Sequence, residues 1–465
     1  MNYLLAAYCL LLALARQRKM AFLFPVLCFF TPKGLGLIDV ASLPYLSENR
    51  AIVIFMIICF FLYILSIGLK IKRTNFPFST AFILLGLSYI GSLASNTQTL
   101  ASDSVTAFML FSEVFFPCYL IWYFCDSPAL AERTLKYIYV TGLFVSIYGT
   151  LSFIIHLNPY FDYIKQTTPT GRVLAADYSG SVRGARAIGT MSNAITFGAF
   201  QAISFLVGVF LLRANRSSAR FLWLMLGQIV LFVGILATAS RTPLIFVLFS
   251  MMIFTCITRT RDKVIIIQIG AVIVALGGFI GLQYIEKVVD FALSVFSQKD
   301  SASATGSSLQ MRIGQALIAW NFFSQSPLFG GGVSKTRSIL ASGAYPDFYG
   351  AESAIFQWAI DMGLFGILAF FTLFLRIFSL VRRLKNRFSR ALMYGMTAGY
   401  FIFVISTGVL ETMQFFLIVV TLMLIADGRG GVQSRVLPVT DCSRPVLDPL
   451  FYEPTVRPRQ QPNQD

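Results

Sequence analysis

The sequence predicts an all-α protein that crosses a membrane about 13 times, a polytopic helix bundle with two long external loops carrying short helices. Three observations lead to this fold class. Hydrophobic residues make up 56% of the chain and charged residues only 12%, about half the charged share of a soluble domain. The apolar runs are continuous rather than alternating, which favours membrane helices over barrel strands. Basic clusters separate the runs in a regular order.

The apolar segments follow one another at short intervals along the chain. A spanning helix needs about 20 apolar residues, and most of the runs approach that length, whereas 2–15 and 243–257 are short. Because the basic cluster 16–19 follows the first run instead of preceding it, we expect a membrane segment there with its N-terminus outside, not a secretory signal. The predicted segments are 2–15, 20–38, 51–69, 78–95, 105–124, 137–157, 191–212, 221–239, 243–257, 264–284, 355–375, 391–408 and 412–426.

The basic clusters orient these segments. With about 13 crossings, all of the clusters fall on one side, which the positive-inside rule identifies as the cytoplasm. The net charge of +16 therefore reflects cytoplasmic loops and does not predict binding to nucleic acid. We expect one membrane domain over 1–427 and a disordered cytoplasmic tail over 428–465. The clusters lie at 16–19, 70–73, 133–136, 213–220, 259–263, 376–390 and in the tail from Arg429.

Two long loops, 158–190 and 285–354, are expected on the opposite face. The second contains a helix signal that runs from Leu309 toward Pro327, which should end it. Arg312 stands in the first turn of this helix, where the helix dipole favours anions over cations. This placement makes sense if an anionic ligand approaches. Three consecutive glycines, 330–332, follow, and their backbone could come close to such a ligand.

Several cations lie on this external face, against the trend that sorts Lys and Arg to the cytoplasm. We interpret them as anion-binding groups, and the alternative that they are solvated or paired with loop aspartates stays open. Arg241 is the sharpest case, because it is a lone cation in a very tight turn between two apolar segments, where an unpaired charge costs about 2–4 kcal/mol. The other candidates are Arg183 and Arg186 in the first loop and Lys335 and Arg337 in the second.

Four short motifs follow one another on the predicted external side. They are Arg186-Ala187-Ile188-Gly189 leading to Asn193, Ser240-Arg241-Thr242, Arg312 with Trp320 and Pro327-Leu328-Phe329-Gly330, and Glu352-Ser353 ahead of Gly363-Leu364-Phe365-Gly366. In order, in spacing and in their predicted side of the membrane, they resemble the motifs of the O-antigen polymerase and O-antigen ligase superfamily of bacterial surface-glycan assembly. The resemblance covers about 180–370, and topology extends it over most of the chain.

The resemblance implies a donor glycan carried on undecaprenyl diphosphate and an acceptor sugar whose hydroxyl attacks the anomeric carbon. We expect Arg241 and Arg312 to stabilise the departing diphosphate, since fixed guanidinium groups lower a barrier where charge builds up and bind phosphate at two points. Glu352 is the candidate base or hydrogen-bond acceptor for the hydroxyl, and a structural salt bridge from it to Arg312 or Arg337 is the alternative. Substrate binding is expected from Arg183, Arg186, Lys335 and Arg337.

One departure from the family pattern bears on the reaction. Ligases of this superfamily carry His-Asn where this chain has Glu352-Ser353, and polymerases often lack that histidine. His156, the only histidine, cannot replace it by sequence position. We therefore predict a polymerase of lipid-linked repeat units, of O-antigen or exopolysaccharide type, in the bacterial inner membrane with a periplasmic active site. A ligase or a protein O-oligosaccharyltransferase is the first alternative.

Two acids lie within apolar segments, where an ionisable residue is a functional candidate by default. Glu113 keeps a second alternative open, a proton-coupled or lipid-linked sugar transporter. Asp361 lies near the outer end of its segment and could instead satisfy an external arginine. Because no carboxylate pair with metal-ligand spacing is visible on the external side, we expect a reaction without metal or cofactor. The implied partners are the donor and acceptor glycans, the bilayer, and a chain-length regulator or other export proteins.

Overall fold

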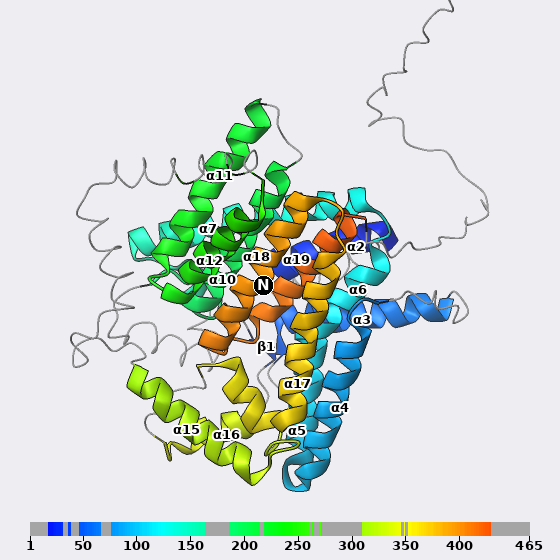
Figure 1. Ribbon diagram of the computed structural model, residues 1–465, viewed down its shortest axis with the longest axis vertical. Coiled ribbons are helices and arrows are strands. Elements are labelled where there is room, and N and C mark those ends of the chain that lie inside the picture. The colour runs from blue at the N-terminus through cyan, green and yellow to red at the C-terminus, as the bar shows by residue number, and fades with distance from the viewer. Residues whose placement is uncertain are drawn as a thin grey trace, which may run out of the picture. The chain divides into compact units, whose positions relative to one another are not determined.

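A computed structural model (Figure 1) describes residues 17–30, 36–38, 46–66, 76–162, 186–213, 218–259, 263, 270, 309–345, 348 and 352–428. The predicted segment 2–15, the segment 264–284 apart from residue 270, the tail from Arg429, and Arg183 lie outside the described residues. The prediction of a helical fold is confirmed. A short antiparallel ribbon, in which β1 (Gly36–Ile38) pairs with β2 (Leu46–Ser47), is the only strand pairing among the described residues, and the sequence analysis missed it.

The helices follow the predicted apolar segments closely. In chain order they are α2 (Gln17–Phe30), α3 (Glu48–Ser66), α4 (Ser79–Ser95), η1 (Thr97–Thr99), α5 (Leu100–Leu110), η2 (Phe111–Phe115), α6 (Phe116–Phe124), α7 (Pro128–Ile155), α10 (Ala194–Leu212), α11 (Ser218–Ala237), α12 (Arg241–Ile257), α15 (Leu309–Gln325), α16 (Lys335–Ser342), α17 (Ala354–Arg382), α18 (Arg387–Thr407) and α19 (Thr412–Ala426).

Five helical stretches of the described chain are long and apolar enough to cross a membrane: Leu100–Phe124, Pro128–Ile155, Ala194–Leu212, Ala354–Arg382 and Arg387–Thr407. Five shorter apolar helices accompany them, Asn49–Leu65, Ser79–Ser95, Phe221–Ala237, Arg241–Ile257 and Thr412–Ala426. An integral membrane protein is therefore supported, and the total of about 13 crossings stays a prediction.

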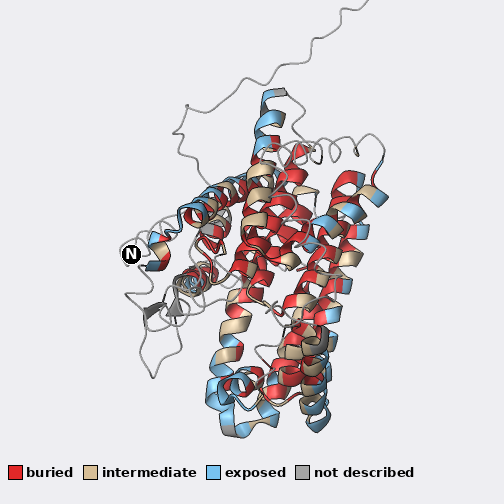
Figure 2. Ribbon diagram, turned by 90° about the vertical axis from the view of Figure 1, so that its left-hand side faces the viewer, coloured by how far each residue is buried: buried red, intermediate tan, exposed pale blue. Residues whose placement is uncertain are grey.

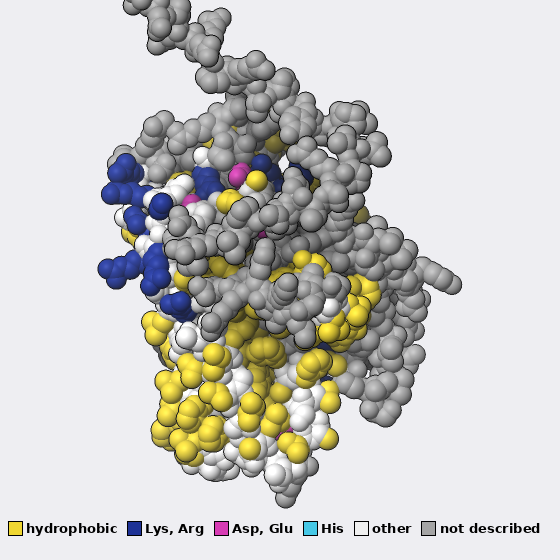
Figure 3. All heavy atoms as spheres, turned by 90° about the vertical axis from the view of Figure 1, so that its right-hand side faces the viewer, with side chains coloured by type: hydrophobic (Ala, Val, Ile, Leu, Met, Phe, Trp, Pro, Cys, Tyr) yellow, Lys and Arg dark blue, Asp and Glu magenta, His cyan; other side chains and the backbone are white. Residues whose placement is uncertain are grey.

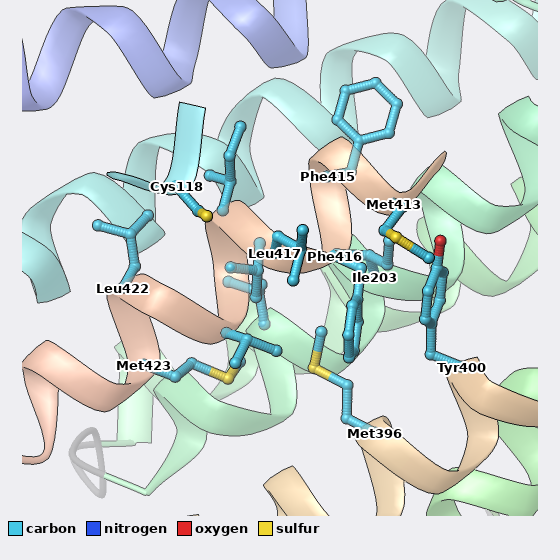
Figure 4. Packing of buried hydrophobic residues seen from close by; sticks show 14 of the residues in the cluster. Cys118, Ile203, Met396, Tyr400, Met413, Phe415, Phe416, Leu417, Leu422 and Met423 are labelled. Carbon is cyan, nitrogen blue, oxygen red and sulfur yellow. The ribbon is translucent and has the colours of Figure 1, made fainter. Parts of the chain in front are cut away.

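The core lies around α10 and α19, whose residues are buried almost throughout (Figure 2). Tyr400 of α18 stacks on Phe416 of α19 with ring centroids 4.0 Å apart, and Met396 and Met413 lie close by (Figure 4). The Tyr400 hydroxyl lies 2.9 Å from that of Thr412, so the one polar atom of this ring is satisfied inside the core.

α12 and α18 approach each other very closely. A side chain at Gly395 or Gly399 of α18 would overlap Ser250 of α12. Small residues four apart let two membrane helices bring their backbones together, because little else drives helix association in lipid. This contact fixes α12, and with it Arg241 at the start of that helix.

Charged residues collect at one end of the helices. Arg213 at the end of α10 contacts Ser389 of α18 and lies 3.2 Å from Asp427 after α19. Burial raises the pKa of the Asp427 carboxyl, and hydrogen bonds from Ser389 and the charge of Arg213 oppose the rise. Figure 3 shows Lys and Arg gathered near the upper end of one face, above a largely hydrophobic surface. The predicted cytoplasmic ends of α10, α18 and α19 therefore do meet on one side.

Candidate active site

At the other end of these helices, the first two motifs meet. The backbone N–H of Ala187 donates to the carbonyl of Ala237 at 3.0 Å, and Nη2 of Arg186 donates to the carbonyl of Ala239 at 3.2 Å. Ala239 has a φ of 45°, in the left-handed region that non-glycine residues rarely adopt. The strained turn after α11 is thus held by the Arg186 segment. This pairing puts Arg186 beside the turn that ends in Ser240 and Arg241.

Arg241 is the first residue of α12, and no acidic residue lies in the first turn of that helix. Arg312 occupies the first turn of α15, which likewise has no acid there. The N-terminus of a helix presents free N–H groups and a partial positive charge, so both arginines add a cation to an end that already favours anions. These two helices of the site therefore begin with a cation and no acid, as α16 and α18 also do.

The end of α18 and the turn that joins it to α19, together residues 406–411 and called the 406–411 turn below, contact the motif segments. Nη2 of Arg312 donates to the carbonyl of Ser406 at 3.4 Å, and Nε2 of Gln357 in α17 donates to the carbonyl of Gly408 at 2.8 Å. Gly408 has a φ of 66°, which suits glycine at the C-terminal end of α18. Side chains from two helices thus bind the same tight turn. One helix, α15, lies in the predicted external loop, and the other, α17, follows that loop.

Glu411 in this turn contacts the beginning of α10. Its Oε1 accepts hydrogen bonds from the Ser192 hydroxyl at 2.6 Å and from the Thr196 hydroxyl. Asn193 caps α10, since its side-chain oxygen accepts from the backbone N–H of Thr196 at 2.8 Å. The segment after Arg186 is therefore tied to the 406–411 turn. Glu411 was not among the candidates predicted from the sequence, although a lone acid in a short interruption between two apolar segments was an available signal.

Glu352 lies near Arg312, the residue with which a structural salt bridge was the alternative to a role as the base. Oε2 of Glu352 is 4.0 Å from Nη2 of Arg312, with side chains 33% and 40% exposed. This distance is well beyond the 2.7–2.9 Å typical of a tight charge-assisted hydrogen bond. The backbone N–H of Glu352 donates to Oε1 of Gln315, a buried residue of α15, at 3.2 Å. The backbone of Glu352 is thus anchored to α15, while its carboxylate contacts Arg312 only loosely.

The glycines 330–332 do not serve as the ligand cradle that we expected. A side chain at Gly330 would overlap the backbone of Asp361, and one at Gly332 would meet Asn96 and Asp103. The N–H of Gly331 donates to the carbonyl of Ile360 at 2.8 Å, and its carbonyl accepts from the Asn96 side chain. The glycines therefore let the loop pack against α4, α5 and α17, so the close approach they permit is to protein.

The segment 327–330 fits into a break in α17. Gly363 has a φ of 61° and interrupts the helix, and the following N–H groups of Leu364 and Phe365 donate to the carbonyls of Pro327 and Leu328 at 2.8 and 3.2 Å. The rings of Phe329 and Phe365 stack 4.8 Å apart. The external loop therefore supplies hydrogen-bond acceptors for N–H groups that the break leaves without helical partners.

Asp361 holds α16 rather than an arginine. Its Oδ1 accepts from the backbone N–H of Thr336 at 2.7 Å, in the first turn of α16, where a carboxylate is favourable. Buried Asp103 of α5 contacts the hydroxyl of Ser334, the residue before α16, so two acids fix the start of this helix. Lys335 and Arg337 therefore sit on a firmly placed helix, and Nζ of Lys335 lies 5.5 Å from the ring centroid of Phe322.

Glu113 lies in η2, a π-helical segment, and pairs with an arginine. Its Oε2 is 2.5 Å from Nε of Arg50 at the start of α3, and both side chains are largely buried. Beside this pair, Nε2 of Gln414 donates to Oδ1 of Asn49 at 3.1 Å. An ion pair between two helices accounts for Glu113 inside an apolar segment without a transported proton.

A family model described as O-antigen ligase matches residues 226–371 of the chain. The match includes Arg241, Arg312 and Glu352, the three residues predicted to carry the chemistry, and it leaves the Arg186 segment outside. The resemblance that the sequence motifs suggested is confirmed over 226–371, and for the Arg186 segment it stays a prediction. No curated protein matches the chain.

Proposed function

We propose, from the match of residues 226–371 to a family model described as O-antigen ligase, that the protein polymerises lipid-linked oligosaccharide repeat units. A membrane enzyme of the O-antigen ligase or polymerase type is supported by the family match and the apolar helices. The finer proposal is glycosyl transfer from an undecaprenyl-diphosphate glycan to a sugar hydroxyl on the periplasmic face of the inner membrane.

The observation that carries the proposal is the convergence on the 406–411 turn. Arg312 donates a hydrogen bond to this turn, and Glu352 lies 4.0 Å from Arg312. Glu411 belongs to the turn and accepts a hydrogen bond from Ser192, in the segment between Arg186 and α10. One arginine and two carboxylates, Arg312, Glu352 and Glu411, thus lie at or near one turn, and hydrogen bonds tie that turn to the start of α10, more than 200 residues away in the sequence. Such a mixture suits a reaction with an anionic leaving group and a hydroxyl nucleophile.

In the proposed reaction the acceptor hydroxyl forms a bond to the anomeric carbon as the bond to the diphosphate oxygen breaks. Arg241 and Arg312 stabilise the negative charge that grows on the lipid diphosphate, at two helix N-termini that add to the positive field. Glu352 accepts the proton of the hydroxyl. Lys335, Arg337 and Arg186 bind the glycan-diphosphate substrate. Arg183, which lies outside the described residues, is proposed for the same role. The arginines replace a divalent cation, so no metal is needed.

A ligase is the second candidate, because the matching family is described by that activity. Glu352-Ser353 at the place of the ligase His-Asn pair favours the polymerase. The Arg50–Glu113 pair weakens the transporter alternative, which rested on Glu113 as an unexplained intramembrane acid.

Reconstituted protein supplied with lipid-linked repeat units tests the proposal. A ladder of lengthening lipid-linked glycans, formed also in excess EDTA, is expected. Transfer of preformed chains to a second acceptor without lengthening would identify a ligase. Activity that disappears in EDTA and returns with magnesium or manganese would contradict metal independence.

A further inference from the structure

α15 has two apolar faces, and only one of them packs against the protein. On the inner face, Gln315 and Ala319 are buried, and Ala319 belongs to a small hydrophobic cluster with Ile339, Phe348 and Ile360. The opposite face carries residues three and four apart that are more than half exposed, Ile313 at 53%, Leu317 at 65% and Trp320 at 66%. We call these three residues the outer stripe. A helix with large apolar side chains on both faces is poorly suited to water.

The outer stripe continues toward an exposed apolar surface on α17. Leu328, also exposed, follows the end of α15 and is hydrogen-bonded through its carbonyl to Phe365 of α17. From there the exposed apolar residues of α17 run along a helix that is long and apolar enough to span a membrane, and they are Leu364, Phe365, Leu368, Phe371 and Leu375. Trp320 and Phe323 are in ring contact at the α15 end of this path. The stripe is thus connected to the exposed apolar surface of a candidate membrane span.

The composition of α15 suits a bilayer surface. Over Leu309–Gln325 the only charged residue is Arg312, and no acid is present to oppose insertion next to lipid headgroups. Trp favours the membrane–water interface, where its ring is apolar and its N–H remains hydrated. We propose that α15 is an interfacial helix, with the outer stripe buried at the boundary between headgroups and acyl chains of the outer leaflet.

This position would explain where Arg312 lies. Arg312 is one residue before Ile313, so it projects about 100° around the helix from the stripe. With the stripe in the leaflet, the guanidinium sits at headgroup level, the depth at which the diphosphate of a lipid-anchored donor rests. This last step rests on the proposed function; the membrane contact of α15 does not.

Quenching of tryptophan fluorescence by brominated lipids tests the contact without an activity measurement. Wild-type protein and Trp320→Phe are placed in nanodiscs of lipids brominated either near the headgroup or deep in the acyl chain. The difference between the two proteins is the signal of Trp320. We expect this signal to fall at least twofold with the shallow bromines and less with the deep ones. Trp223, exposed on α11, remains in both proteins.

A charge on the stripe provides the matched comparison. Leu317→Glu should reduce the shallow quenching of Trp320, whereas Asn321→Glu, an exposed neighbour at the flank of the stripe, should leave it nearly unchanged. The proposal is overturned if Trp320 is unquenched by either lipid and accessible to iodide, which means that the stripe faces water. It is equally overturned if Trp320 is shielded from both bromine and iodide, which means that protein covers the stripe. Glycan synthesis can fail in any of these cases without changing the quenching result.

Discussion

Replacing Arg312 with Lys should separate catalysis from stability. Nη2 of Arg312 lies 3.4 Å from Ser406 O and 4.0 Å from Oε2 of Glu352, and the side chain is 40% exposed. Neither contact is short, and partly exposed ion pairs contribute about 0–1 kcal/mol, so the Lys variant should unfold nearly like wild type. The transition state is different, because only the planar fork can bind two oxygens of a diphosphate. Loss of such a contact typically lowers the rate by about 10²–10³, or about 2.7–4 kcal/mol.

The assay compares initial rates of chain lengthening by purified wild type and variant on a defined lipid-linked repeat, with the thermal midpoint of each protein measured alongside. Arg383→Lys is the matched control, since Arg383 is exposed at the C-terminal end of α17, the end that is predicted to face the cytoplasm. It should retain full rate and full stability. A near wild-type rate for Arg312→Lys would refute the reasoning, because the guanidinium fork would then not be needed at the leaving group. If Arg312→Lys instead lowers the thermal midpoint together with the rate, Arg312 serves to stabilise the fold.

Three further predictions concern the same site. Glu352→Gln should lower the rate while donor binding, measured by filter retention of labelled donor, persists; full activity would instead make Glu352 a structural partner of Arg312. Glu411→Ala removes the acceptor of two hydroxyls and should destabilise the protein by about 2–4 kcal/mol in denaturant titrations, whereas Glu411→Gln should lose less than half as much; equal losses would argue against a hydrogen-bonding role. In a cysteine-free background, Ser338→Cys should react with an impermeant reagent in intact cells and Lys385→Cys should not, and the reverse pattern would invert the topology.

Local features of this chain were predictable because they depend on neighbours in sequence. The helix from Leu309 ends before Pro327 as expected, since proline disfavours the helical conformation of the preceding residue. The tight turn before Arg241 followed from the polar interruption between two apolar runs, and α12 begins at that arginine. The grouping of Arg213 with Asp427 agrees with the charge sorting that assigned both ends to one side of the membrane.

The features that were missed depend on contacts between distant segments. Glu411 and Thr196 are 215 residues apart, and neither periodicity nor composition brings them together. The glycines 330–332 show the complementary error. Glycine correctly indicated a close approach of the backbone, but the sequence could not say whether a ligand or protein approaches. The glycines pack against α17. The break in α17 at Gly363 belongs to the same contact, because the backbone of Leu328 occupies the space that a side chain at position 363 would need.

The misplaced arginines are the part of the sequence that points most directly to function. The helix dipole favours acids over cations in the first turn, and α12 and α15 each carry an arginine there and no acid within that turn. Local rules are usually broken at functional sites, where another interaction offsets the cost. Both arginines lie within the matched family region, and Arg312 contacts the segment that also holds α10 through Glu411. An anionic donor that binds beside Arg312 would offset the unfavourable placement of a cation at the start of α15, so we expect donor binding to stabilise this helix.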